Sequence, residues 1–165
     1  MLTNEKINEF LGITESYQAP RTLLSILMDE AKKNCLFEQF LQEEPNLSYE
    51  WFHDYFEAEH ADRKKKKQDF TPDSVSELCA KIIGPSDEYF EAAAGTGGMM
   101  IQAWNVNPNR FFTVEELSDR SIPFLIFNLS IRNINGVVRH GDSLKQDFKN
   151  TYVLNSGEKF SQIII

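Results

Sequence analysis

Segments of strand length alternate with segments of helical pattern after residue 87, and this alternation limits the possible folds more than any other feature. Two segments have the pattern of helices, residues 97–104 and 119–134. Four short apolar segments have the pattern of strands: residues 88–93, 110–116, 136–142 and 159–165. Strands that alternate with helices are typical of an α/β fold, in which crossover helices connect the strands of a parallel sheet. Ligands of such sheets bind beyond the carboxyl ends of the strands.

Helical patterns dominate the first third of the chain. Apolar residues recur at helical spacing from Arg21 to Leu41, and a second helix is expected from about Ser48, whose hydroxyl can cap it. Four aromatic residues fall on one side of this second helix. They could form a binding surface, but we expect them to pack in a helical core: Trp51, Phe52, Tyr55 and Phe56.

A third helix is predicted over residues 71–83. Thr71 can act as its N-cap, Pro72 suits the first helical position, and Gly84 can end it. Its apolar residues should form a buried stripe: Val75, Leu78, Cys79, Ile82 and Ile83.

The charge of −8 is unevenly distributed. Residues 1–62 contain 4 basic and 13 acidic residues, whereas residues 63–165 contain 13 and 12. An acidic surface repels phosphate, so the first region should face a protein partner or solvent rather than DNA. The basic run at residues 63–67 is expected to be a solvated hinge or helix end, with a phosphate contact as the alternative.

Neither a secreted nor a membrane protein is indicated. Cys35 and Cys79 form no CxxC pair, so neither a zinc site nor a disulfide framework is predicted. No apolar run approaches the roughly 18 residues of a membrane span. We therefore expect a cytoplasmic protein without a membrane partner.

Acidic residues and a glycine-rich turn occupy the predicted strand ends. Glu91 precedes the turn at residues 95–98, Glu115 and Glu116 end the second strand, and Asp142 lies at the end of the third. Glycines allow a sharp turn, and the free N–H groups of the next helix can bind a carboxylate or phosphate.

Phosphate-binding motifs fit this turn poorly. A P-loop would need Lys and Ser or Thr where Met99 and Met100 stand, and the dinucleotide fingerprint GxGxxG is only half present. His53, His60 and His140 have no ligand or triad spacing, and no metal site is predicted.

Four motifs resemble, in order and spacing, those of the gamma-class N6-adenine DNA methyltransferases. The similarity is greatest to the methylase (M) subunit of type I restriction-modification systems. The motifs are QDFTP (68–72), EAAAGTGG (91–98), VEELSDRSIPFLIFNLSIRNI (114–134) and HGDSL (140–144). Residues 1–62, which the resemblance covers only by their general helical character, are expected to form an acidic helical region. The resemblance implies part of a Rossmann-like S-adenosylmethionine-dependent methyltransferase domain over residues 63–165.

The resemblance also implies a cofactor site for S-adenosylmethionine. Phe70 and Thr71 would lie over the methionine end, and Glu91 would accept from the ammonium group. Glu116 would bind the ribose hydroxyls, and Asp142 would accept from the adenine amino group. The remaining site residues would line the methionine and sulfonium or lie beside the adenine: Ala93, Gly95, Thr96 and Gly97 in the first group, Ser143 and Leu144 in the second. Glu91 and Ala92 stand where the family usually has Asp-Pro, and Ala94 where Cys is common, which puts cofactor affinity in question.

The family's catalytic tetrapeptide, of the Asn-Pro-Pro-Tyr type, is absent, since the sequence contains no Pro-Pro. It would begin within a residue or two of Ile165, after the fourth strand. We therefore expect a truncated domain that binds cofactor weakly and is inactive alone, with no catalytic residue of its own. The apolar fourth strand would be an exposed edge that pairs with another copy, is covered by the N-terminal helices, or causes aggregation.

Two alternative functions are compatible with the same sequence. The same half-domain could belong to an enzyme that methylates RNA or protein. It could also be a non-catalytic pseudo-methyltransferase that pairs with restriction-modification subunits. DNA is the expected partner of the full-length family member, but this segment should bind it weakly or not at all.

Overall fold

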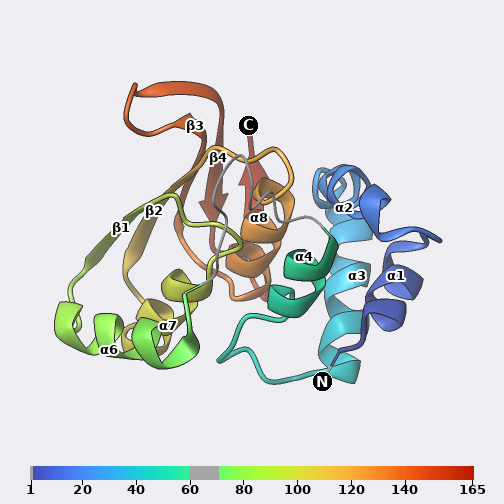
Figure 1. Ribbon diagram of the computed structural model, residues 1–165, viewed down its shortest axis with the longest axis horizontal. Helices are drawn as coiled ribbons and strands as arrows, with labels where there is room; N and C mark the ends of the chain where they lie inside the picture. The colour runs from blue at the N-terminus through green and yellow to red at the C-terminus, as the bar shows by residue number, and fades with distance from the viewer. Residues whose placement is uncertain (1, 60–70) are drawn as a thin grey trace.

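The computed structural model describes residues 2–59 and 71–165 (Figure 1). Phe70, His60 and the basic run at 63–67 lie outside the described residues. The helices are α1 (Asn4–Leu11), a 3-10 helix (Ser16–Gln18), α2 (Ala19–Leu27), α3 (Glu30–Glu43), α4 (His53–Glu59), α6 (Asp73–Ile83), α7 (Gly98–Val106) and α8 (Ile122–Ile131). The strands are β1 (Glu88–Ala92), β2 (Phe111–Glu116), β3 (Gly136–Asp142), β4 (Asp147–Asn155) and β5 (Gln162–Ile164).

The five strands of the described residues form one mixed sheet in the order β1-β2-β3-β4-β5. The first three are parallel, with α7 and α8 as crossover connections, which confirms the predicted α/β class and three of the four predicted strands. The fully parallel sheet is wrong, because β4 and β5 pair antiparallel. Residues 143–146 fold the chain straight back after β3, and so short a connection can join only antiparallel strands.

The end of the chain also differs from expectation. The predicted strand at 159–165 is reduced to β5, and the residues just before it are buried against α3. Lys33 Nζ donates to the carbonyl of Ser161 at 2.6 Å, and the rings of Phe37 and Phe160 lie 5.0 Å apart. Of the three predicted fates of this segment, cover by the N-terminal helices therefore holds for Phe160 and Ser161, while Ile164 remains 52% exposed.

The N-terminal helices differ from the predicted ones in their ends. The helix expected from Arg21 is divided into α2 and α3, because the Asp29 side chain accepts from Lys32 N at 3.1 Å and caps a new helix. The helix expected from Ser48 begins only at His53. Core packing of its aromatic residues is confirmed, since Trp51, Phe52, Tyr55 and Phe56 are all buried.

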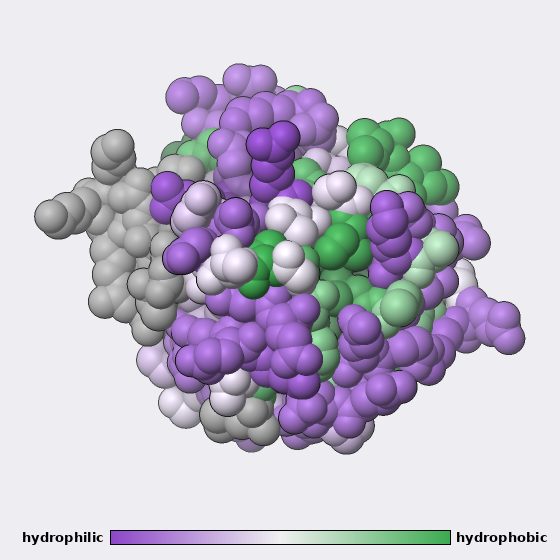
Figure 2. All heavy atoms as spheres, turned by 90° about the vertical axis from the view of Figure 1, so that its right-hand side faces the viewer, coloured by the Kyte–Doolittle hydropathy of each residue, from purple (hydrophilic) through white to green (hydrophobic). Residues whose placement is uncertain are grey.

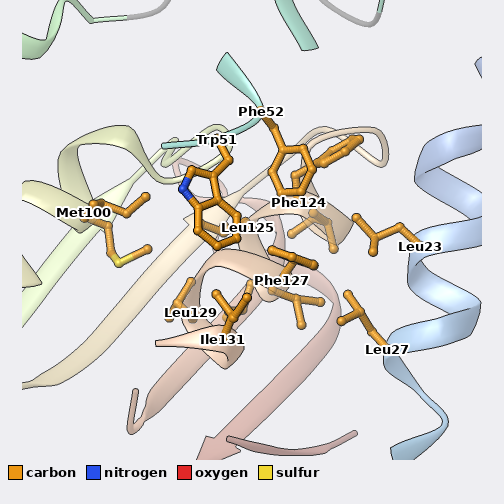
Figure 3. Packing of buried hydrophobic residues seen from close by; sticks show 14 of the residues in the cluster. Leu23, Leu27, Trp51, Phe52, Met100, Phe124, Leu125, Phe127, Leu129 and Ile131 are labelled. Carbon is orange, nitrogen blue, oxygen red and sulfur yellow. The ribbon is translucent and has the colours of Figure 1, made fainter. Parts of the chain in front are cut away.

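Helix α8 lies at the centre of the hydrophobic core. All its residues are buried, between the sheet and the N-terminal helices (Figure 1). The ring of Phe127 lies 4.9 Å from those of Phe37, Phe40 and Phe52. Figure 3 shows the side chains of α8 between α2 on one side and Met100 of α7 on the other. The N-terminal region and the sheet therefore share one core.

The buried apolar stripe predicted for helix α6 is wrong. The helix begins after Pro72, so Thr71 is not its N-cap, although Gly84 does end it. Only Ser76 and Ala80 are buried in α6. Of the residues expected inside, Cys79 is partly buried. The other four are exposed to between 44% and 76%: Val75, Leu78, Ile82 and Ile83. The helical period was right, but the described chain supplies no cover for this face.

The surface around the N-terminal helices is mostly hydrophilic (Figure 2), in keeping with the acidic composition of this region. Among the described residues, no helix has the length and apolarity needed to cross a membrane.

Candidate cofactor site

The carboxyl ends of β1, β2 and β3 lie side by side, because these strands are parallel neighbours. Glu116 and Asp142 are the last residues of β2 and β3, and Glu91 precedes the last residue of β1. The three predicted acidic residues therefore reach the same edge of the sheet. Two of them, Glu91 and Glu116, are close enough to influence each other electrostatically.

The glycine turn follows β1 and is attached to the end of β2. Glu116 Oε2 accepts from Gly95 N at 2.8 Å, and its Oε1 accepts from Ser118 N at 2.7 Å. The neighbouring Glu115 points elsewhere, since its carboxylate lies 3.1 Å from Arg139 Nη1. Alternation along the strand thus separates two adjacent glutamates into different environments.

The turn needs backbone conformations that favour glycine. Gly95 and Gly97 have φ angles of 60° and 103°, and Ala93 adopts 57° despite its Cβ. A Cβ on Gly97 would lie 2.9 Å from Met100 Cε and 3.1 Å from Leu125 Cδ1. Gly97 is therefore required both by its conformation and by its close approach to α8.

Glu91 has an unusually high pKa. Burial and, to a smaller extent, the nearby charge of Glu116 raise its pKa to about 7, although a hydrogen bond from Tyr89 Oη at 2.8 Å opposes the shift. Burial and the Glu91 carboxylate also raise the pKa of Tyr89. A cation placed beside Glu91 would favour its ionised form.

Asp142 makes its contacts within its own turn. Its Oδ1 accepts from Leu144 N at 3.0 Å and from Lys145 N at 3.1 Å, and these bonds lower its pKa. Ser143 is partly buried and Leu144 is 98% exposed. Asp142 thus lies at the same edge of the sheet as Glu91 and Glu116, but the hydrogen bonds of its carboxylate stay within its own turn.

The other predicted site residues are distributed unevenly. Thr96 is buried within the turn, whereas Thr71 is exposed before α6. Phe70 lies outside the described residues. In the described ranges, no group of three His, Cys, Asp or Glu side chains is placed to hold a metal ion.

A family model described as N-6 DNA Methylase matches residues 47–164. The chain belongs to this family. It is also similar to the type I restriction enzyme MjaVIII methylase subunit of Methanocaldococcus jannaschii, with 31% identity over 105 residues. That similarity covers 59% of this chain but only 18% of the relative. No solved structure matches the chain.

The match to the N-6 DNA methylase family begins at residue 47, before the boundary at 62/63 predicted between the two regions. The extra segment contains Glu50, whose Oε1 accepts from Asn128 Nδ2 at 2.7 Å. Asn128 also donates to the carbonyl of Thr96 at 2.8 Å. No role was predicted for the side chains of Glu50, Asn128 or Arg132. For Asn128, the available signal was its position as a polar residue within the otherwise apolar helix IPFLIFNLSI.

Proposed function

We propose that this chain is the S-adenosylmethionine-binding part of a type I restriction-modification DNA methyltransferase that modifies the adenine N6 amino group. The observation that carries the proposal is the joining of Glu91, Glu116 and the glycine turn at adjacent carboxyl ends of parallel strands. Membership of the N-6 DNA methylase family supports this reading, as does the similarity to a type I methylase subunit.

The chemistry of these residues fits the amino-acid end of the cofactor. Two neighbouring carboxylates repel each other, so a bound ammonium group would stabilise the ionised form of Glu91. The Glu116 carboxylate already accepts from two backbone N–H groups. Each of its oxygens retains a lone pair for a ribose hydroxyl.

The roles at the two ends of the site are part of the same proposal. Thr71 and Phe70 would cover the methionine end, and Ala93 to Gly97 would line the methionine and sulfonium. Asp142 would accept from the adenine amino group, with Ser143 and Leu144 beside it. The exposed side chain of Leu144 is available to cover an adenine ring.

S-adenosylmethionine, when bound, supplies a methyl group on a sulfonium. The residues of this chain would hold and orient it, which is the main contribution to an in-line transfer. The sequence contains no Pro-Pro and therefore no tetrapeptide of the family's catalytic type. We therefore propose that this chain alone binds the cofactor without methylating DNA, and that DNA and restriction-modification subunits are partners of the full-length enzyme.

Calorimetry with S-adenosylmethionine tests the proposal. Glu91→Gln and Glu116→Gln should each weaken binding by about tenfold or more, because each removes a charged acceptor. Glu88→Gln is a matched control, since Glu88 lies on the same strand and is exposed. Equal affinity of all four proteins, or no binding by the unsubstituted chain, would contradict the proposed site.

A non-catalytic protein that pairs with restriction-modification subunits is the second candidate function. Such a protein would bind a purified type I methylase or specificity subunit equally well with and without cofactor. Binding that requires S-adenosylmethionine, or its loss in Glu91→Gln, would speak against it.

A further inference from the structure

Residues 47–52 form an irregular segment that is attached to α8 by Arg132. Arg132 Nε donates to the carbonyl of Leu47 and its Nη2 to the carbonyl of Tyr49, each at 2.9 Å. The guanidinium lies 6.0 Å from the ring of Trp51 and 5.8 Å from that of Trp104. Arg132 is only 4% exposed, so the segment is held by a buried charge rather than by surface contacts.

Asn128 connects this segment to the glycine turn. Its two amide hydrogens are used by Glu50 Oε1 at 2.7 Å and by the Thr96 carbonyl at 2.8 Å. Its Oδ1 accepts from Arg132 Nη1 at 3.0 Å. Rotating the amide by 180° would turn its oxygen toward the Glu50 carboxyl and its NH2 group toward Arg132, so both neighbours select one orientation.

The glycine turn is consequently held from two directions. Glu116 binds the N–H of Gly95, and Asn128 binds the carbonyl of the next residue, Thr96. The following residue, Gly97, is the N-cap of α7 and has a φ of 103°. Fixing the Thr96 peptide therefore fixes the direction in which α7 begins.

We propose that Glu50 is a positioning residue for the cofactor turn, acting through Asn128 on the Thr96 peptide. Glu50 would then support the cofactor site from a segment that precedes the sheet in sequence. This inference rests on the proposed function for its effect on cofactor binding, but its effect on the turn can be measured without cofactor.

Glu50 is suited to this role as an acceptor rather than as a charge. Its Oε1 also accepts from Phe52 N at 3.0 Å, and burial raises its pKa to about 7, so near neutrality it is partly uncharged. A glutamine has the same shape and can accept the same two bonds. Leucine is similar in size but accepts none.

The experiment compares Glu50→Leu and Glu50→Gln with the unsubstituted chain. Tyr49→Phe is the control in the same segment, since it removes only the bond from Tyr49 Oη to Glu44 at 2.7 Å. The readouts are the dissociation constant of S-adenosylmethionine, amide hydrogen exchange at residues 95–98 relative to β1–β3, and fluorescence. The two tryptophans, Trp51 and Trp104, both flank Arg132 and report on the network directly.

We expect Glu50→Leu to weaken cofactor binding about tenfold. It should also accelerate exchange at 95–98 about tenfold more than in β1–β3, and change the tryptophan emission. Glu50→Gln should stay within about threefold of the unsubstituted chain in both measurements. Tyr49→Phe should leave both unchanged.

Three results would overturn the inference. The first is Glu50→Leu with unaltered exchange in the turn. The second is Glu50→Leu with uniformly faster exchange across the whole sheet, which would show a general loss of stability. The third is a Glu50→Gln variant as impaired as Glu50→Leu, which would show that charge rather than acceptor geometry matters.

Two further outcomes separate the inference from the proposed function. If the unsubstituted chain binds no S-adenosylmethionine, the proposed function fails, while exchange at 95–98 still decides the role of Glu50. If Glu50→Leu does not fold, Glu50→Asp replaces it, because a side chain one methylene shorter draws the carboxyl back from Asn128. Selective loosening of the turn then supports the inference, and an unchanged turn overturns it.

Discussion

The two faces of the sheet have similar apolar sequences but different environments. On one face, Tyr89, Phe112 and Leu154 are at most 5% exposed, in a row that is aligned across β1 to β4. The next aligned row, on the other face, includes Phe90 at 61% and Val153 at 37% exposed. Right-handed connections place α7 and α8 on the same face, because both crossovers move in the same direction along the sheet.

This difference shows what strand composition can and cannot predict. A strand with apolar residues on both faces, such as EYFEA, is typical of a parallel sheet covered on both sides. The described chain covers one side. The helices repeat the contrast, since all of α8 is buried whereas most of the apolar residues of α6 are exposed.

The largest effect on the free energy of unfolding is expected on the covered face of the sheet. Phe127→Ala in α8 should lower the free energy of unfolding by about 3–5 kcal/mol, because it removes a ring at the centre of an aromatic cluster. Phe90→Ala removes the same ring from the exposed face and should cost about 1 kcal/mol or less. Urea unfolding measures both. Similar losses in the two variants would mean that the second face is also covered in solution.

The contact between the turn and α8 sharpens the same comparison. Gly97→Ala should lower the free energy of unfolding by roughly 2–3 kcal/mol, because the new Cβ is strained and approaches Leu125 Cδ1 at 3.1 Å. Gly98→Ala is the matched control, since no atom lies within 4 Å of a Cβ there. It should be neutral or slightly stabilising. Equal unfolding midpoints for the two variants would show that Leu125 of α8 does not pack closely against the turn.

A smaller effect concerns the pH dependence of stability. The pKa of Glu91 is raised to about 7 by burial, above its unfolded value of about 4.5. The contribution of Glu91 to the free energy of unfolding is therefore fully present below about pH 4.5 and is lost as pH rises through 7. On the order of 1–2 kcal/mol should be lost between pH 5 and 8, and Glu91→Gln should remove that part of the slope.

Burial also raises the pKa of Glu50, so the stability of the unsubstituted chain against pH does not isolate Glu91. The difference between this curve and that of Glu91→Gln does. Affinity for S-adenosylmethionine should change in the opposite sense, strengthening as pH rises through 7 and Glu91 ionises. A Glu91→Gln curve parallel to that of the unsubstituted chain would place Glu91 in a solvated environment.

The smallest effect on stability is expected on the exposed face. Val153→Thr preserves the shape of the side chain and should change the free energy of unfolding by only about 0.5 kcal/mol. It should, however, reduce binding of a hydrophobic dye and any concentration-dependent self-association, because it interrupts the exposed apolar row. Unchanged dye binding and sedimentation would show that this row does not behave as a free surface.

Local signals were sufficient for much of the fold. Strands β1 to β3 were predicted to within about one residue, because each is a short apolar run with turn residues beside it. Strand β4 was missed, since DFKNTYVLN is largely polar and the tight turn before it has only a weak sequence signal. Asp29 likewise divides a continuous helical pattern by capping a new helix, which periodicity alone does not detect.

Prediction of the candidate site from local sequence patterns was limited in the same way. Glu91, the glycine turn and Glu116 were predictable because strand ends and turns have local patterns. Glu50 was not predictable, because its partner Asn128 lies 78 residues away and no periodicity connects them. Asn128 itself is a polar residue in an apolar helix, and this gives no indication of which residues it contacts.

The sequence by itself determined where the parallel strands and their crossover helices lie, and which acidic residues stand at the strand ends. These properties depend on neighbours within a few residues, on backbone preference and on the spacing of apolar side chains. Only the tertiary structure decided which apolar faces are covered, that the sheet turns antiparallel after β3, and that Asn128 connects Glu50 to the glycine turn. Burial and long-range hydrogen bonds depend on which segments meet in space, and a local pattern contains no record of that.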